Sequence, residues 1–176
     1  MVWIYRVMTR EAFIEVLNGE GYSYEIKGNK IVVTDDDAVH LDALTSIPPG
    51  VVFRNEGFVY LGALTSLPPG VVFRNEGSVH LDALTSIPPG VEFRNGGGVG
   101  LGALTSLPSG VVFNNGGAVG LGALPSLPPG VEFRNKGQVW LDALIGGGFD
   151  DWKGNIEGID SKRLLNLMIK QGLFER

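Results

Sequence analysis

The chain lacks cysteine altogether and contains only two histidines. Without thiols, neither a disulfide framework nor a thiolate zinc site can form, and a reducing compartment such as the cytoplasm is the expected location. Long apolar runs are also missing, so we expect no membrane-spanning helix and no membrane as a partner. The first residues are interrupted by Arg6 and Arg10, a pattern that does not resemble a secretory signal peptide.

Positive charge is also in short supply, because 14 basic residues face 19 acidic ones and the net charge is −5. Binding to a phosphate backbone needs a basic surface, so the composition disfavours nucleic acid as a partner. Acidic side chains gather only at Asp35, Asp36 and Asp37. Three neighbouring carboxylates are too few to imitate a nucleic acid along a face.

A twenty-residue repeat dominates the middle of the chain. The five complete units are AVHLDALTSIPPGVVFRNEG (38–57), FVYLGALTSLPPGVVFRNEG (58–77), SVHLDALTSIPPGVEFRNGG (78–97), GVGLGALTSLPSGVVFNNGG (98–117) and AVGLGALPSLPPGVEFRNKG (118–137), and a sixth begins as QVWLDAL (138–144). Repetition of this regularity indicates that each unit stacks on the next and contacts mainly its neighbours.

Each unit contains two short alternating apolar stretches, VYL (59–61) and VVF (71–73) in the second one. This period of two predicts half-buried strands, and the TSLPPG and NEG segments between them have the composition of turns. The fold class expected is therefore mainly β: a parallel β-solenoid with two strands per coil and about five 20-residue coils, roughly 25 Å long. The side chains expected inside the second coil are Val59, Leu61, Ala63, Leu64, Leu67, Val71 and Phe73.

One asparagine recurs in every complete unit, at Asn55, Asn75, Asn95, Asn115 and Asn135. We interpret this column as a structural ladder in which stacked side-chain amides bond along the stack and also satisfy the backbone of the corner.

The flanking segments are expected to cap the open ends of the stack. The chain then divides into an N-terminal α/β cap (1–37), the repeat solenoid (38–144) and a C-terminal loop and helix cap (145–176). In the first cap we predict a strand over 2–7, a helix over 10–17 ended by Asn18-Gly19, and a hairpin around Gly28-Asn29. In the last we predict a helix from Asp160 or Ser161 to Gln171, with Trp152 in the preceding loop plugging the core. The C-terminal helix could instead form a homodimer contact.

Outward positions of the first strand differ among units that are otherwise nearly identical. One column runs His40, Tyr60, His80, Gly100, Gly120, Trp140, and a second runs Asp42, Gly62, Asp82, Gly102, Gly122, Asp142. The glycines predict a shallow groove of nearly bare strand, walled by His80 and Asp82 on one side and by Trp140 and Asp142 on the other. A protein partner could approach closely there, with Tyr60 and Trp140 as aromatic anchors. Repeat drift on a solvated face is the alternative.

The second strand presents its own outward columns, Val52, Val72, Glu92, Val112, Glu132 beside Arg54, Arg74, Arg94, Asn114, Arg134. We interpret them as a solvated salt-bridge ladder, with self-association through the exposed valines as the rival interpretation.

No residue pattern indicates chemistry. His40 and His80 lie two coils apart, about 10 Å at the spacing of stacked strands, so they cannot share a metal ion. The serines have no histidine nearby in sequence, and the glycine runs lack the helix and lysine of a phosphate loop. We therefore expect no enzyme, no catalytic residue, no metal and no cofactor.

The LTSLPPG corner that follows VYLGA, like the LTSIPPG corner that follows VHLDA, resembles the corners of leucine-rich-repeat-like proteins of bacteria and their phages. The resemblance covers 38–144 and implies a repeat solenoid that binds protein. Small acidic repeat proteins of this kind are often carried by phages, which suggests a phage-borne inhibitor of a host defence component, of the anti-CRISPR type. The alternatives are a structural or self-assembly module and an enzyme with its site in the terminal segments.

Overall fold

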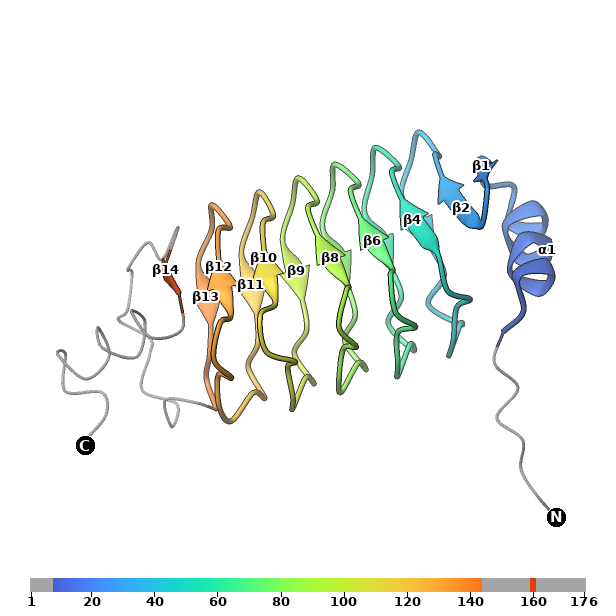
Figure 1. The fold of residues 1–176 in the computed structure, drawn as a ribbon. Helices are drawn as coiled ribbons and strands as arrows, with labels where there is room; N and C mark the ends of the chain where they lie inside the picture. The colour runs from blue at the N-terminus through green and yellow to red at the C-terminus, as the bar shows by residue number, and fades with distance from the viewer. Residues whose placement is uncertain (1–7, 144–158, 161–176) are drawn as a thin grey trace, which may run out of the picture.

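The computed structural model of the chain describes residues 8–143 and 159–160, and it shows a row of stacked coils with a helix at one end (Figure 1). The elements in chain order are α1 (Arg10–Glu20), β1 (Tyr24–Lys27), β2 (Lys30–Val33), β3 (Val39–His40), β4 (Val51–Phe53), β5 (Val59–Tyr60), β6 (Val72–Phe73), β7 (Val79–His80), β8 (Glu92–Phe93), β9 (Val99–Gly100), β10 (Val112–Phe113), β11 (Val119–Gly120), β12 (Glu132–Phe133), β13 (Val139–Trp140) and β14 (Ile159–Asp160). The predicted mainly β parallel solenoid is confirmed.

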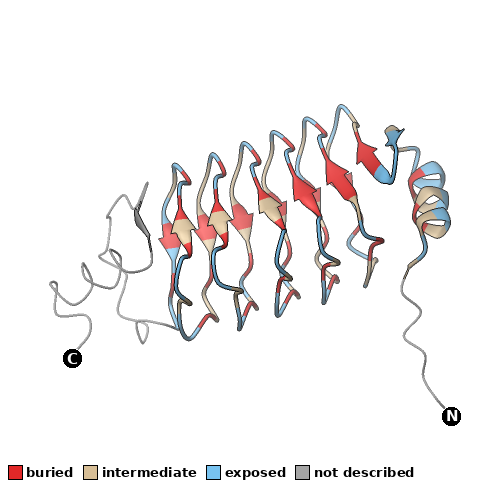
Figure 2. Cartoon of the chain, in the orientation of Figure 1, coloured by how far each residue is buried: buried red, intermediate tan, exposed pale blue. Residues whose placement is uncertain are grey.

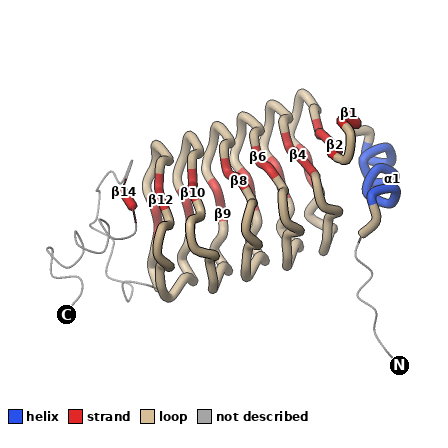
Figure 3. Tube along the Cα trace, viewed as in Figure 1, coloured by secondary structure: helices blue, strands red, loops and turns tan. Residues whose placement is uncertain are grey.

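Two sheets run along the stack, one on each side. Strands β1-β2-β4-β6-β8-β10-β12-β14 form an eight-stranded sheet, and β13-β11-β9-β7-β5-β3 form a six-stranded sheet. Between coils the strands are parallel and pair residues twenty apart, such as Phe53 with Phe73 and Tyr60 with His80. Each strand is short and each coil is mostly loop (Figure 3), so the repeated corners determine the shape of the coil as much as the strands do.

The core lies between the two sheets, whose strands carry much of the buried residue colour in Figure 2. It consists of files of identical or similar side chains. The fully buried rings of Phe53, Phe73, Phe93, Phe113 and Phe133 stack with centroids 5.3–5.4 Å apart. In the second coil the expected interior residues are buried except Ala63, which is half-buried. Ala63 lies in the turn of residues 62–63, where the backbone leaves the strand and no longer alternates strictly.

Each coil turns at a Pro-Pro-Gly or Pro-Ser-Gly corner whose glycine has a positive φ of 76–83°. Gly70, with a φ of 76°, represents this position in the second unit. L-residues with side chains rarely adopt that conformation, which explains why the corner repeats glycine there.

Helix α1 closes the first end of the stack. Thr9 accepts a hydrogen bond from the backbone N–H of Ala12 as the N-cap, and Phe13 and Leu17 are fully buried against the coils. The predicted end of the helix at Asn18-Gly19 is wrong, since the helix continues to Glu20 and Gly21 is the residue with left-handed φ. Gly19 sits within the last turn, and the N–H of Gly21 bonds back to the carbonyls of Asn18 and Leu17.

The predicted hairpin around Gly28 and Asn29 is present, with Lys27 opposite Lys30. Its second strand, β2, already belongs to the solenoid, because it pairs in parallel with β4 at a spacing of twenty residues. Asp35 therefore takes the position that asparagine occupies in later coils, and its carboxylate accepts from the N–H groups of Ser23 and Asp37. The stack thus includes half a turn before residue 38.

At the other end, β14 pairs antiparallel with β12, opposite Phe133 and Glu132. Asp160, one of the two predicted starts of the C-terminal helix, belongs to this strand. The predicted N-terminal strand, the loop with Trp152 and the remainder of the predicted C-terminal helix lie outside the described residues. In the part of the chain that is described, no helix has the length and apolarity needed to cross a membrane.

Candidate functional site

Three aromatic rings stack on the outer side of the six-stranded sheet. Tyr60 lies between His40 and His80, with ring centroids 4.5 and 4.9 Å away and both interplanar angles at 9°. The cause is the parallel register of β3, β5 and β7, which repeats the same side-chain direction at the spacing of neighbouring strands. The result is a continuous aromatic ribbon across three coils.

Phe58 widens this ribbon toward the asparagine corner. Its ring centroid is 6.0 Å from that of Tyr60 and 6.3 Å from that of His80. The side chain is 45% exposed, and only Ile26 and Trp140 match it among the large apolar residues described. We name the group His40, Phe58, Tyr60 and His80 the aromatic ribbon.

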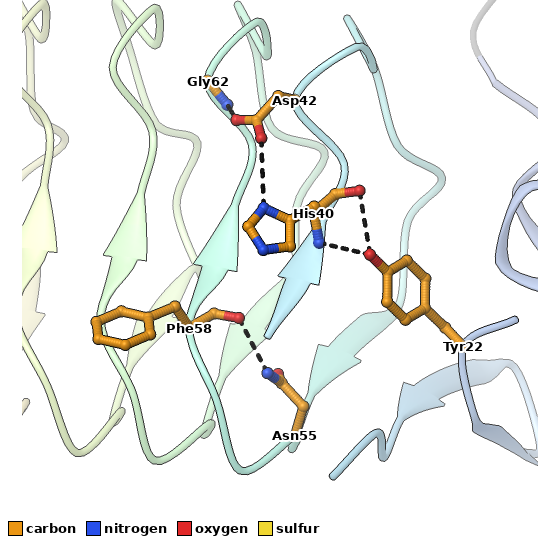
Figure 4. A network of polar contacts seen from close by, with 6 residues as sticks. All are labelled: Tyr22, His40, Asp42, Asn55, Phe58 and Gly62. Atoms are coloured by element: carbon orange, nitrogen blue, oxygen red, sulfur yellow. Dashed lines mark hydrogen bonds and ion pairs between the residues drawn. The ribbon is translucent and has the colours of Figure 1, made fainter. Parts of the chain in front are cut away.

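Polar contacts hold the first coil of the ribbon in place (Figure 4). The N–H of His40 donates to the hydroxyl of Tyr22 at 2.8 Å, so a side chain from the N-terminal cap satisfies the edge strand β3. The carboxylate of Asp42 accepts from the N–H of Gly62 at 3.0 Å and lies 3.9 Å from Nδ1 of His40. A Cβ at position 62 would come within 3.0 Å of that carboxylate, so glycine there gives Asp42 its room.

Beyond His80 the same face is bare backbone for two coils. Gly100 and Gly120 pair with each other, and Gly120 pairs in turn with Trp140 on β13. Trp140 is 53% exposed. We name the surface formed by Gly100, Gly102, Gly120 and Gly122 the glycine face.

The walls expected around the glycine face lie beside it. A Cβ at Gly100 would be 3.5 Å from the carboxylate of Asp82 and 3.7 Å from Nδ1 of His80, so both side chains approach that glycine. On the far side, a carboxylate oxygen of Asp142 lies 3.0 Å from the Cβ position of Gly122. The predicted site residues are thus brought to one side of the solenoid, in the order ribbon, glycine face, Trp140.

The asparagine column is buried at the corner before the first strand of each coil. The Nδ2 atom of Asn95 donates to the carbonyls of Gly77, Gly97 and Gly98 at 3.0–3.1 Å. The bonds expected from one asparagine side chain to the next are absent. The Oδ1 atoms of all five asparagines are buried and accept no hydrogen bond in the described structure. These residues hold the corners of neighbouring coils together.

The outer side of the eight-stranded sheet carries ion pairs. Glu92 lies 2.9 Å from Nε of Arg94 and 3.8 Å from Arg74, and Glu132 accepts from Arg134. The expected exposure of the outward valines is wrong for Val52 and Val72, which are 7% and 9% exposed. They form a separate small cluster with Val32, because side chains on parallel in-register strands cover one another.

A pocket of about 330 Å³ on this side was not anticipated from the sequence. The fourth coil has Ser109 where other units have proline and Asn114 where they have arginine, and both residues line the pocket. Val112 forms part of the lining, with Arg94 and Arg134 to either side. The sequence signal for this pocket is that Ser109 and Asn114 both depart from the repeat in the same coil.

The carboxyl of Glu25 on β1 is paired with a lysine of the same strand. The pKa of Glu25 is lowered by the hydrogen bond and the positive charge of Lys27, whose ammonium lies 2.5 Å away on the same strand. No group of three or more histidine, aspartate or glutamate side chains that could hold a metal ion occurs among residues 8–143.

No protein-family model matches the chain. No curated protein matches it, and no solved structure does either.

Proposed function

We propose that this protein is a non-enzymatic scaffold that binds another protein on the outer side of its six-stranded sheet. The observation that carries the proposal is the aromatic ribbon ending at bare strand, with Trp140 standing beyond it. Exposed stacked aromatics are costly to leave in water and are the side chains that most often anchor protein interfaces.

The glycine face supports the same proposal through its geometry. Gly102 has nothing within 4 Å of its Cβ position, and the nearest atom to that of Gly120 is a backbone oxygen at 3.8 Å. Side chains would therefore fit at these positions without steric conflict. Their absence leaves the backbone open to close approach by a partner strand or helix.

The narrower proposal is that the partner is a host defence component and that the protein is a phage-borne inhibitor of the anti-CRISPR type, acting in the cytoplasm. Its support is the likeness of the LTSLPPG corner to leucine-rich-repeat-like proteins of bacteria and phages, together with the acidic, cysteine-free composition.

The test compares two variants that introduce arginine on opposite sheets of the solenoid. Gly100→Arg with Gly120→Arg fills the glycine face, and Asn114→Arg restores the repeat residue on the other sheet as the matched control. A partner captured from host lysate is purified, and its affinity for each variant is measured by calorimetry beside the melting temperature. We expect the double variant to lose at least tenfold in affinity with an unchanged melting temperature, and the control to bind as the original does.

Equal binding by the double variant would overturn the location of the site. The inhibitor proposal needs a further result, namely that the complex is stoichiometric and that it blocks the activity of a purified defence effector. A captured partner with no defence activity would overturn that narrower proposal and leave the binding face standing.

A further inference from the structure

Within the described part of the chain, the first strand of the eight-stranded sheet has a free edge. Among the described residues β1 pairs only with β2, and it is the outermost strand in the sheet order. The N–H of Thr34 donates to the carbonyl of Ser23, which makes the odd-numbered residues of this strand the ones bonded to β2. The backbone groups of Tyr24 and Ile26 consequently point away from the sheet, ready to accept another strand.

The side chains on this edge are exposed in a way that suits pairing. Ile26 is 50% exposed, although its cross-strand neighbour Ile31 is fully buried in the core. Because neighbouring residues of a strand alternate between faces, Glu25 and Lys27 share the opposite face, and both are more than half exposed. An apolar residue is thus flanked by one acid and one base.

This pattern is complementary to itself. If a second copy of β1 runs antiparallel with a two-fold axis through Ile26, each Ile26 meets the other, and each Glu25 lies opposite a Lys27. We propose that the free edge of β1 pairs with β1 of a second copy of this chain, joining the two eight-stranded sheets into one. The homodimer is independent of the partner-binding face, which lies on the other sheet.

Backbone hydrogen bonds and burial of Ile26 supply the stabilisation, while the charges set register and orientation. Glu25 and Lys27 already form an ion pair within one strand, so dimerisation exchanges two local pairs for two crossed ones. Exposed pairs contribute little net free energy, whereas like charges directly opposite each other disfavour a pairing. The edge has only four residues, so the dimer should be in exchange with monomer at accessible concentrations.

Charge reversal provides the test, with sedimentation equilibrium of the full chain as the readout. Glu25→Lys alone places lysines opposite lysines, and Lys27→Glu alone places glutamates opposite glutamates, so each should weaken dimerisation at least tenfold. Mixing the two single variants should restore a dimer that contains one of each. The double variant Glu25→Lys, Lys27→Glu is again self-complementary and should dimerise as the original chain does.

A crosslink then locates the contact, because the chain has no cysteine of its own. Under mild oxidation Ile26→Cys should form a disulfide-linked dimer. Phe58→Cys should not, although the side chain of Phe58 is almost as exposed as that of Ile26. Circular dichroism confirms that each variant is folded. A monomer at every concentration, a dimer unaffected by either single reversal, or a double variant that stays monomeric would each overturn the proposal. The reversals at Glu25 and Lys27 should leave binding to a protein partner unchanged, because both residues lie on the other sheet.

Discussion

The side-chain amide of Asn75 donates a hydrogen bond of 3.1 Å to the carbonyl oxygen of Gly57, which lies in the preceding coil. The same amide nitrogen donates to the carbonyl of Gly77 in its own coil at 2.9 Å. One side chain therefore joins two successive corners, and the arrangement recurs along the stack. Buried carbonyl groups need hydrogen-bond donors, so the stability of the solenoid should depend on the asparagine amide at the corner of each coil.

Removing one of these donors should destabilise the stack. Asn95→Ala removes the three hydrogen bonds that this amide donates to the carbonyls of Gly77, Gly97 and Gly98. The carbonyl of Gly98 then has no side-chain donor, while those of Gly77 and Gly97 keep the one from the asparagine of the neighbouring coil. We expect a loss of about 1–3 kcal/mol in the free energy of unfolding, measured in urea. Asn114→Ala is the control, since this exposed asparagine should change stability by no more than about 0.5 kcal/mol. Equal effects of the two substitutions would contradict the role of the buried column.

The glycines after the asparagine column should resist even a methyl group. A Cβ at Gly97 would lie 2.5 Å from the backbone nitrogen of Ser78, so Gly97→Ala must push neighbouring coils apart. We expect it to cost about 1–3 kcal/mol, as overpacking generally does. Gly102→Ala, which meets open space, should be neutral within about 0.5 kcal/mol. Chemical denaturation of both variants measures the difference, and a tolerated Gly97→Ala would mean that the corners are looser than the structure shows.

Restoring proline at the fourth corner should stabilise the protein. Gly110 has a φ of 76°, equal to that of Gly70, so the corner with Ser109 has the turn geometry of its Pro-Pro-Gly relatives. Ser109→Pro then restricts the unfolded chain without straining the folded one, and we expect a gain of about 0.4–1 kcal/mol. Thermal unfolding gives the result. A lower melting temperature would show that the N–H of Ser109 or the neighbouring pocket matters to the fold.

The ion pair on β1 should be visible in a titration. Lys27 lowers the pKa of Glu25, so Lys27→Gln should move that pKa upward toward the ordinary value of a glutamate. The folded-state pKa is the depressed one, so any stabilisation from the pair is present above the unfolded-state pKa and is lost as the pH falls through the folded-state pKa. NMR titration of the Glu25 carboxyl carbon measures the shift. Lys136→Gln, far along the stack, is the control and should leave the titration of Glu25 unchanged.

Much of the fold could be predicted because a repeat makes one local inference hold many times. The alternation in VVF placed Val71 and Phe73 inside, and the identity of successive units implied parallel pairing in register. The end of α1 was misplaced because Asn18-Gly19 has the composition of a stop, whereas the glycine that adopts the left-handed conformation is Gly21, just after Glu20. Two glycines lie close together at this end of the helix, and the composition alone does not indicate which of them ends it.

The candidate site was foreseen in part. The outward column from His40 to Trp140 follows from strand alternation, and so does the position of the glycine face. The stacking of His40 on Tyr60 and the sideways contribution of Phe58 could not be inferred, since rotamers and the path of the corner decide which rings meet. The pocket beside Asn114 also could not be inferred. It depends on how Ser109 in the corner and Asn114 after the strand are placed relative to each other in space.

By itself the sequence determined the period, the interior files and the two kinds of corner, because residues twenty apart must share one environment if each coil stacks on an identical neighbour. Only the tertiary structure decided that the asparagine amides bond to backbone rather than to one another, that β2 already belongs to the stack, and that Val52 and Val72 are covered. These outcomes depend on distances between chain segments, and no local pattern of residues contains such distances.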